Sequence, residues 1–293
     1  MARSASGGPP VADADAPAPR PLVPGVASAL SPLVRRILAP NPGPMTGPGT
    51  NTYLVGIDEV AVIDPGPDDV AHLDAIAGCG GDRIRWILCT HAHPDHAPGA
   101  ANLKKLTGAD VLAFGPGNGL LVDRALADGD QVEATEFRLT AVYTPGHAPD
   151  HLCYYLEEER MLFAGDHVME GSTVVIAPPE GDMAAYIESL ERLRGRRMRS
   201  IAPGHGHLIE DPKAAIAAYI AHRLDRERQV LEALAAEAPT TTERLVEIVY
   251  EGLAPELVPW AARSVHAHLL KLHAEGRATS PTPGDLGAPW RPA

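Results

Sequence analysis

A cluster of metal-ligand residues in one short segment constrains this chain more than any other feature. His91, His93, Asp95 and His96 directly follow the apolar run 84–89, which predicts a buried strand. Imidazole and carboxylate groups are the usual non-sulfur ligands of zinc in proteins. Loops at strand ends are held rigidly by a sheet, so their side chains can converge in one cleft. The segment therefore predicts a metal site at the end of a strand.

Three further ligand residues also follow predicted strands or strand exits. His147 comes after a Thr-Pro-Gly turn, Asp166 after the run 161–163, and His205 after the run 200–202. Adjacent glycines let the backbone turn tightly and approach a metal closely. His147 can supply a third nitrogen to a first metal, His205 can complete a second, and the Asp166 carboxylate can bridge both. The sequence thus supplies enough ligands for two metal ions.

Alternating strand-like and helical patterns predict a layered α/β sandwich between residues 30 and 238. Apolar runs broken by Gly and Pro predict strands at 52–55, 60–63, 84–89, 110–114, 137–143, 152–156, 161–163 and 200–202. Helical spacing predicts helices at 100–108, 183–193 and 211–238, while residues 33–38 have a helical or mixed spacing. A capping-box pattern at 240–243 then begins a small helix-turn-helix module.

The net charge of −13 argues against a general attraction to nucleic acid, because phosphate binding needs clustered cations. The nearest basic cluster comprises Arg192, Arg194, Arg196, Arg197 and Arg199. We interpret this cluster as a solvated helix end, where cations are favoured by the helix dipole. We therefore expect no DNA binding.

Cysteine use and hydropathy predict a cytoplasmic location. The three cysteines, Cys79, Cys89 and Cys153, form no CxxC pair, which is typical of buried thiols in a reducing compartment. No apolar run approaches the ~18 residues of a membrane-spanning helix. Residues 1–20 are rich in Ala, Pro and Gly and lack the apolar core of a signal peptide.

The complete ligand pattern resembles that of the metallo-beta-lactamase superfamily. This resemblance implies a four-layer αββα sandwich that binds two Zn²⁺ ions, with Mn²⁺ or Fe²⁺ as alternatives. It implies one metal bound by three histidines, a second bound by a mixed set, and one bridging carboxylate. The three histidines implied for the first metal are His91, His93 and His147. The mixed set implied for the second metal is Asp95, His96 and His205, and the bridging carboxylate is that of Asp166.

Flanking motifs resemble the beta-lactamase-like protein 2 family, which ends in a winged helix. They are Asn41-Pro-Gly-Pro-Met45, Gly49-Thr-Asn-Thr-Tyr53, Thr144-Pro-Gly-His-Ala-Pro-Asp-His151, Pro203-Gly-His-Gly206 and Ala221-His-Arg223. We accordingly predict a disordered tail at 1–29, a hydrolase domain at 30–238, a winged-helix-like domain at 239–280 and a flexible tail at 281–293.

The implied chemistry is hydrolysis by a hydroxide that bridges the two metals. Asp95 is the expected catalytic residue, since it can orient the attacking hydroxide. Asp64, at a strand exit, and His151 are candidates for bracing a ligand or contacting substrate. His167 and His207 lie beside ligand positions without fitting the pattern.

The substrate stays open between a phosphodiester and a carboxyl ester or thioester. Animal members of the family resemble endoribonucleases that act on single-stranded RNA, and such a reaction predicts a basic groove leading to the metals. The alternative is a thioesterase resembling glyoxalase II, although residues 166–176 contain no Lys or Arg to grip glutathione. A beta-lactamase or a winged-helix regulator fits less well, because no export signal and no basic recognition helix are evident. The module that follows residue 239 can also support a homodimer.

Overall fold

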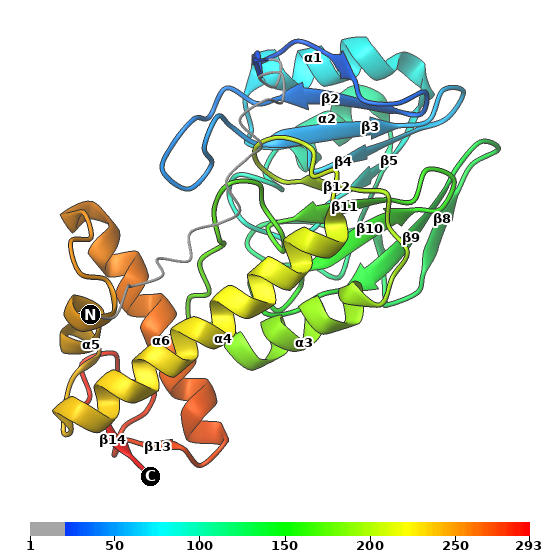
Figure 1. The fold of residues 1–293 in the computed structure, drawn as a ribbon. Coiled ribbons are helices and arrows are strands. Elements are labelled where there is room, and N and C mark those ends of the chain that lie inside the picture. Colours follow the sequence, from blue (N-terminus) through cyan, green and yellow to red (C-terminus); the bar gives the residue numbers. More distant parts are fainter. Residues whose placement is uncertain (1–20) are drawn as a thin grey trace.

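Two β-sheets pack face to face in the computed structural model, which describes residues 21–293 (Figure 1). The first sheet has the strand order β1-β2-β3-β4-β5-β6-β7, and the second has the order β12-β11-β10-β9-β8. Apolar side chains from both sheets form the shared core, including Tyr53, Ile63, Leu139, Tyr154 and Phe163. Removal of this surface from water is the main stabilising contribution, at about 1.5–3 kcal/mol for each large apolar side chain.

The strands of the first sheet are β1 (Ser28–Ala29), β2 (Val34–Leu38), β3 (Asn51–Val55), β4 (Val60–Ile63), β5 (Ile84–Leu88), β6 (Asp110–Ala113) and β7 (Arg124–Ala125). Those of the second are β8 (Gln131–Glu133), β9 (Arg138–Tyr143), β10 (Leu152–Leu156), β11 (Met161–Gly165) and β12 (Ser200–Pro203). β4 to β7 pair in parallel, as do β11 and β12. The remaining neighbours are antiparallel, so the sheets are mixed.

Helices cover the outer face of each sheet. On the first sheet lie α1 (Val70–Gly80), the short helix η1 (Gly81–Arg83) and α2 (Ala100–Thr107). Leu73 and Leu103 of these helices pack in one cluster with Val62 and Ile87 of the sheet. On the second sheet lie α3 (Met183–Arg194) and the first half of α4 (Pro212–Glu237). The four layers confirm the predicted αββα sandwich.

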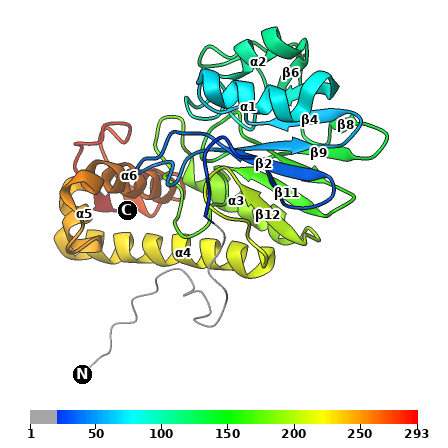
Figure 2. The ribbon, with the colours of Figure 1, turned by 90° about the horizontal axis from the view of Figure 1, so that it is seen from above.

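The long helix α4 extends beyond the sandwich to the C-terminal module (Figure 2). Its start is fixed by Asp211, whose carboxylate accepts a hydrogen bond from Ala214 N, and by Pro212 at the first turn. Its second half contributes Val230 and Leu234 to the core of the module. Among residues 21–293, no helix is long and apolar enough to cross a membrane.

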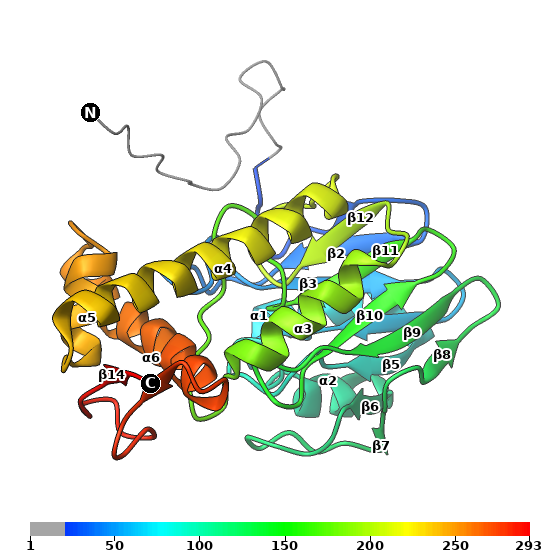
Figure 3. The same cartoon turned by 60° about the horizontal axis from the view of Figure 1, so that its bottom comes forward.

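The C-terminal module consists of α5 (Thr242–Val249), η2 (Pro255–Leu257), α6 (Val258–Ala274), β13 (Ala278–Thr279) and β14 (Arg291–Pro292). Its core gathers Val265 and Leu269 of α6 around the fully buried Trp290. Figure 3 shows α5, α6 and β14 grouped beside the far end of α4. Thr240 and Trp290 exchange backbone hydrogen bonds in both directions. The helices agree with the predicted helix-turn-helix pattern, and the paired β-segments follow them.

Three sequence expectations differ from the structure. Residues 33–38 were expected to be helical or mixed, but 34–38 form β2, because pairing with β3 outweighs local spacing. The predicted flexible tail at 281–293 instead packs into the module through Trp290 and β14. Of the predicted disordered tail at 1–29, residues 1–20 lie outside the described residues. The remainder of this tail is held against the first sheet, because β1 pairs with β2 and Gly25 N donates a hydrogen bond to Leu38 O.

Candidate metal centre

The seven predicted ligand residues meet at one edge of the two sheets. They lie in the loops that leave β5, β9, β11 and β12 at the C-terminal ends of those strands. Within the described residues, two sets of side chains have ligand atoms that lie within 4.8 Å of one another. The sets are His91, His93 and His147, and Asp95, His96, Asp166 and His205. We call them the first and second groups.

In the first group, three ring nitrogens face one another. His91 Nε2 is 2.9 Å and His147 Nε2 is 3.0 Å from His93 Nδ1. Burial holds the pKa of His91 well below its usual range and also lowers the pKa of His147. Neutral imidazoles keep a lone pair free, which is the form that binds a metal. The first group therefore fits a cation held by three nitrogens.

In the second group, the polar atoms converge without hydrogen-bonding partners. Asp166 Oδ1 is 3.3 Å from both His96 Nε2 and His205 Nε2, and Asp95 Oδ2 is 3.2 Å from His205 Nε2. The buried atoms His96 Nε2, His205 Nε2 and Asp166 Oδ1 make no hydrogen bond among the described residues. Buried polar atoms are rarely left unpaired, so three at one point indicate a ligand that the protein is built to hold.

Asp166 faces both groups. Its Oδ1 points to the second group, while its Oδ2 lies 3.6 Å from His147 Nε2 of the first. A carboxylate oriented in this way can bind one cation through each oxygen. The geometry therefore fits two metal ions with one bridging carboxylate.

The protonation of the second group reflects its carboxylates. Burial lowers the pKa of His96, but the surrounding carboxylates, Asp166 first, hold this pKa well above its usual range. Burial likewise opposes a charged His205, yet the adjacent carboxylates of Asp166 and Asp95 raise its pKa to about 9. Burial raises the pKa of Asp166, but the two imidazoles hold it well below the usual range. A metal that bound in the second group would therefore compete with protons for the imidazole nitrogens.

Asp64 orients two of the histidines from behind. Its Oδ2 accepts a hydrogen bond from His96 Nδ1 at 2.8 Å and another from Thr90 Oγ1 at 2.9 Å. Thr90 Oγ1 in turn lies 3.0 Å from His91 Nδ1. These contacts fix which ring nitrogen faces each group. The structure places Asp64 where the sequence suggested a bracing role, whereas Thr90 was missed, although it directly precedes His91.

Backbone carbonyls orient two more histidines. His147 Nδ1 donates to Val175 O at 2.9 Å, and His205 Nδ1 donates to Gly49 O at 3.1 Å. The loop that carries His205 is itself held by Asn51, whose Nδ2 donates to Pro203 O and Gly206 O. No sequence motif identifies a backbone carbonyl as the hydrogen-bond acceptor of a histidine, so sequence reasoning could not find these partners.

Gly204 shows why a small residue borders the second group. A Cβ atom at this position would lie 2.8 Å from both Asp166 Oδ1 and His96 Cε1. Any larger residue would push one of these side chains away from the group. The glycine that the sequence placed beside His205 is therefore required by close approach.

The other singled-out histidines lie outside both groups. His151 is fully buried, its Nδ1 is 2.9 Å from Thr144 Oγ1, and its ring centre is 5.0 Å from that of His91. His167 is also buried, and burial lowers its pKa to about 3. His207 is partly exposed. His151 thus packs behind the first group rather than in it.

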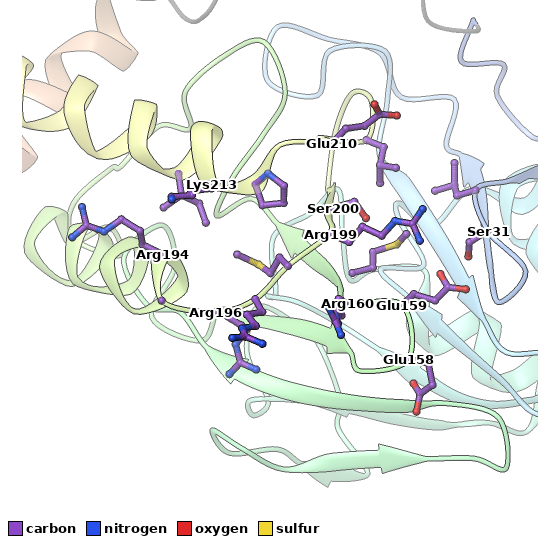
Figure 4. A pocket seen from close by; sticks show the side chains of 18 of the residues that line it. Ser31, Glu158, Glu159, Arg160, Arg194, Arg196, Arg199, Ser200, Glu210 and Lys213 are labelled. Carbon is purple, nitrogen blue, oxygen red and sulfur yellow. The ribbon is translucent and has the colours of Figure 1, made fainter.

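A hollow of about 1530 Å³ lies away from the candidate metal ligands. Figure 4 shows side chains that line it, which include cations and also the carboxylates of Glu158, Glu159 and Glu210. Met161 and Ser200, at the start of β11 and β12, line it, whereas the ligand residues follow the opposite ends of these strands. Its cations are Arg160, Arg194, Arg196, Arg197, Arg199 and Lys213. As expected for a helix end, Arg192 and Arg194 lie in the last turn of α3. An RNA substrate predicts a basic groove that leads to the metals. This hollow lies at the opposite ends of β11 and β12 from the ligand residues, so it is not that groove.

Two family models match consecutive parts of the chain. The metallo-beta-lactamase superfamily matches residues 45–205, and the beta-lactamase associated winged helix domain matches residues 241–284. With the αββα layers and the two ligand groups, these matches define the class of protein. The chain belongs to the metallo-beta-lactamase superfamily, whose members are hydrolases that usually bind metal ions.

Within this superfamily, the chain is similar to proteins named beta-lactamase-like protein 2 homolog, as the flanking motifs predicted. The Drosophila melanogaster protein of that name is 34% identical over 276 residues, covering 87% of this chain and 92% of the relative. An Aspergillus chevalieri protein named atrochrysone carboxyl ACP thioesterase is 36% identical over 243 residues, covering 78% and 76%. A solved beta-lactamase domain protein from Burkholderia ambifaria shares the fold, with a TM-score of 0.78, 23% identity and coverage of 92% and 95%.

Proposed function

We propose that this protein is a two-zinc hydrolase that cleaves thioesters. In this proposal His91, His93 and His147 bind one ion, Asp95, His96 and His205 bind the other, and Asp166 bridges them. The observation that carries the proposal is the placement of Asp166, with one oxygen toward each group and unpaired buried atoms around it. Mn²⁺ or Fe²⁺ would fit the same nitrogen and oxygen ligands, so metal analysis must identify the native ion.

Two zinc ions in such a site would lower the pKa of a shared water and stabilise negative charge on the attacked carbonyl. Asp95 is the most exposed member of the second group, because its side chain is 25% exposed while those of His96, Asp166 and His205 are at most 11% exposed. We assign it the orientation of the attacking water and acceptance of its proton. The reaction forms the acyl C–O bond, breaks the C–S bond and returns the proton to the departing thiolate.

Charge near the first group favours a thioester over RNA. Glu180 Oε2 lies 3.5 Å from His93 Nε2, and Asp150 Oδ2 accepts a hydrogen bond from Ala92 N. Carboxylates in these places repel a phosphodiester backbone but not a neutral thioester. Several similar fungal proteins carry the name atrochrysone carboxyl ACP thioesterase, which supports the same substrate class. Residues 166–176 contain no Lys or Arg that could grip glutathione, which favours a thioester of a thiol other than glutathione.

Metal analysis and a substrate panel test this proposal. The purified protein is assayed with an acyl-N-acetylcysteamine thioester, acyl-coenzyme A, an acyl-glutathione, a phosphodiester chromogen, single-stranded RNA and a cephalosporin. We expect two zinc ions per chain and preferential cleavage of the thioesters other than acyl-glutathione. Asp95→Ala should lose this activity, whereas Asp74→Ala, which removes an exposed carboxylate of α1, should not.

Two outcomes would overturn parts of the proposal separately. A protein that binds no metal, or an Asp95→Ala variant with undiminished activity, would reject the two-metal mechanism. Cleavage of RNA or the phosphodiester chromogen in preference to every thioester would leave the metal site in place and reject the substrate class.

A further inference from the structure

Arg223 carries a buried charge that the proposed reaction does not use. It lies in the middle of α4 and is only 3% exposed. Among the described residues it forms no ion pair with a carboxylate. Its Nε has no hydrogen-bonding partner either. A buried guanidinium without a carboxylate costs several kcal/mol, so its other contacts must account for its presence.

The first contact leads to a metal ligand. Arg223 Nη2 donates a hydrogen bond to Val174 O at 2.5 Å. The next carbonyl along the chain, Val175 O, accepts the hydrogen bond from His147 Nδ1. Val174 itself is buried, so the segment that holds His147 is fixed between Arg223 and the core.

The second contact leads toward the bridging carboxylate. The Arg223 guanidinium lies over the ring of Tyr186, 5.2 Å from its centre. Tyr186 Oη donates to His167 O at 2.7 Å, and His167 directly follows Asp166. A cation over an aromatic face is attracted to it most strongly where water is excluded. One side chain of α4 therefore supports both the loop behind His147 and the residue after Asp166.

We propose that Arg223 is a positioning residue for the first metal group. It holds Val174 so that the neighbouring Val175 O fixes the ring orientation of His147. The inference rests on the proposed function, because it assumes that His147 binds a metal. Loss of a group that orients a metal ligand typically weakens metal affinity about 10–100-fold.

Arg226 offers a matched control on the same helix. Its Nη1 donates to Val249 O at 2.8 Å, and its guanidinium lies 4.1 Å from the ring centre of Tyr250. It thus makes the same two kinds of contact as Arg223, but with the C-terminal module instead of the metal loops. Arg226→Met removes an equivalent side chain without touching the segment behind His147.

The test measures metal affinity rather than turnover. Metal-free wild type, Arg223→Met and Arg226→Met are titrated with Zn²⁺ against a chromophoric chelator, and with Co²⁺ while the visible ligand-field spectrum is followed. We expect Arg223→Met to bind one of the two ions about 10–100-fold more weakly and to change the Co²⁺ spectrum. Arg226→Met should match the wild type in both measurements.

Arg223→Lys keeps the inference testable if Arg223→Met does not fold. Lysine retains the charge but lacks the planar fork, so it cannot both reach Val174 O and cover the Tyr186 ring in the same way. We expect an intermediate loss of affinity for the same ion. Wild-type affinity for both ions in a folded Arg223→Lys or Arg223→Met variant would overturn the inference.

Hydrogen exchange of the metal-free protein separates this inference from the proposed function. Arg223→Met should increase exchange in residues 172–176, whereas Arg226→Met should not. A wild type that binds no metal would reject the proposed function, while unchanged exchange would reject the role of Arg223.

Discussion

Buried histidines lie both at the metal centre and in the C-terminal module, and the two sets differ in what surrounds them. At the metal centre, each of His91, His96 and His205 has one ring nitrogen bonded outward and the other facing a ligand group. In the C-terminal module, His268 is fully buried and neither of its ring nitrogens has a hydrogen-bonding partner among the described residues. Burial alone therefore does not make a metal site. The convergence of several ligand atoms and a fixed outer nitrogen distinguish the metal centre, because His268 has only one carboxylate oxygen nearby, Glu227 Oε2 at 4.0 Å from its Nδ1.

The largest effect should come from breaking the link between the two groups. Asp166→Ala removes the carboxylate that faces both, so we expect loss of at least one metal ion and a fall in thioester hydrolysis on the order of 10³-fold. Metal content and kcat/KM are measured together. His268→Gln, the matched change in the other histidine set, should leave both unaltered. Full metal occupancy in Asp166→Ala would contradict its bridging role.

The next largest effect should be confined to the C-terminal module. Trp290→Ala leaves a cavity among Val265, Leu269 and their neighbours, and we expect a loss of about 3 kcal/mol in the free energy of unfolding. Chemical denaturation measures this loss, and zinc content should stay the same. If the metal centre emptied as well, the two regions would not be as independent as their separate cores indicate.

A smaller effect should follow from loosening one outer contact at the metal centre. Asp64→Asn weakens the hold on His96 Nδ1 and Thr90, so we expect metal affinity to fall about 10–100-fold. Chelator competition measures it. The exposed Asp74→Asn change on α1 is the control. An Asp64→Asn protein that retains wild-type affinity would show that burial suffices to orient this histidine.

The smallest effect concerns pH and His268. Burial, aided by nearby Arg223, lowers the pKa of His268 to about 3, whereas an unfolded histidine titrates near its ordinary pKa of about 6.5. The unfolded chain therefore binds more protons between these values, and stability falls as pH drops below about 6.5. From pH 7 to pH 5, metal-free wild type should lose about 2 kcal/mol more than His268→Gln in denaturant unfolding. Equal losses would mean that His268 is already charged or exposed when folded.

The convergence of the candidate ligand residues could be predicted from sequence because each lies in a short segment at a strand exit. His91, Asp166 and His205 needed only local pattern, and the sheet then brought their loops to one edge. The partners of their outer nitrogens are different. Val175 O and Gly49 O are backbone atoms from distant loops, so their positions depend on tertiary packing that no motif records.

Elements with weak local signals were also harder to predict. Helix α1 contains Gly78 and Gly80, is apolar on most sides and was not anticipated. The chain end was expected to be frayed because it is rich in Pro and Gly, yet the single Trp290 anchors it. In both cases long-range burial decided the structure. The domain boundaries remain predictions, since α4 contributes apolar residues to the cores on both sides of them.

The long helix α4 sets a fixed geometry between the two regions. Its 26 residues correspond to about 39 Å at 1.5 Å per residue, and no Gly or further Pro interrupts it after Pro212. Because it is buried in a core at each end, the C-terminal module cannot swing like a domain on a linker. The helix therefore fixes where the module lies relative to the two ligand groups, so a molecule bound to the module would approach these groups from one direction only.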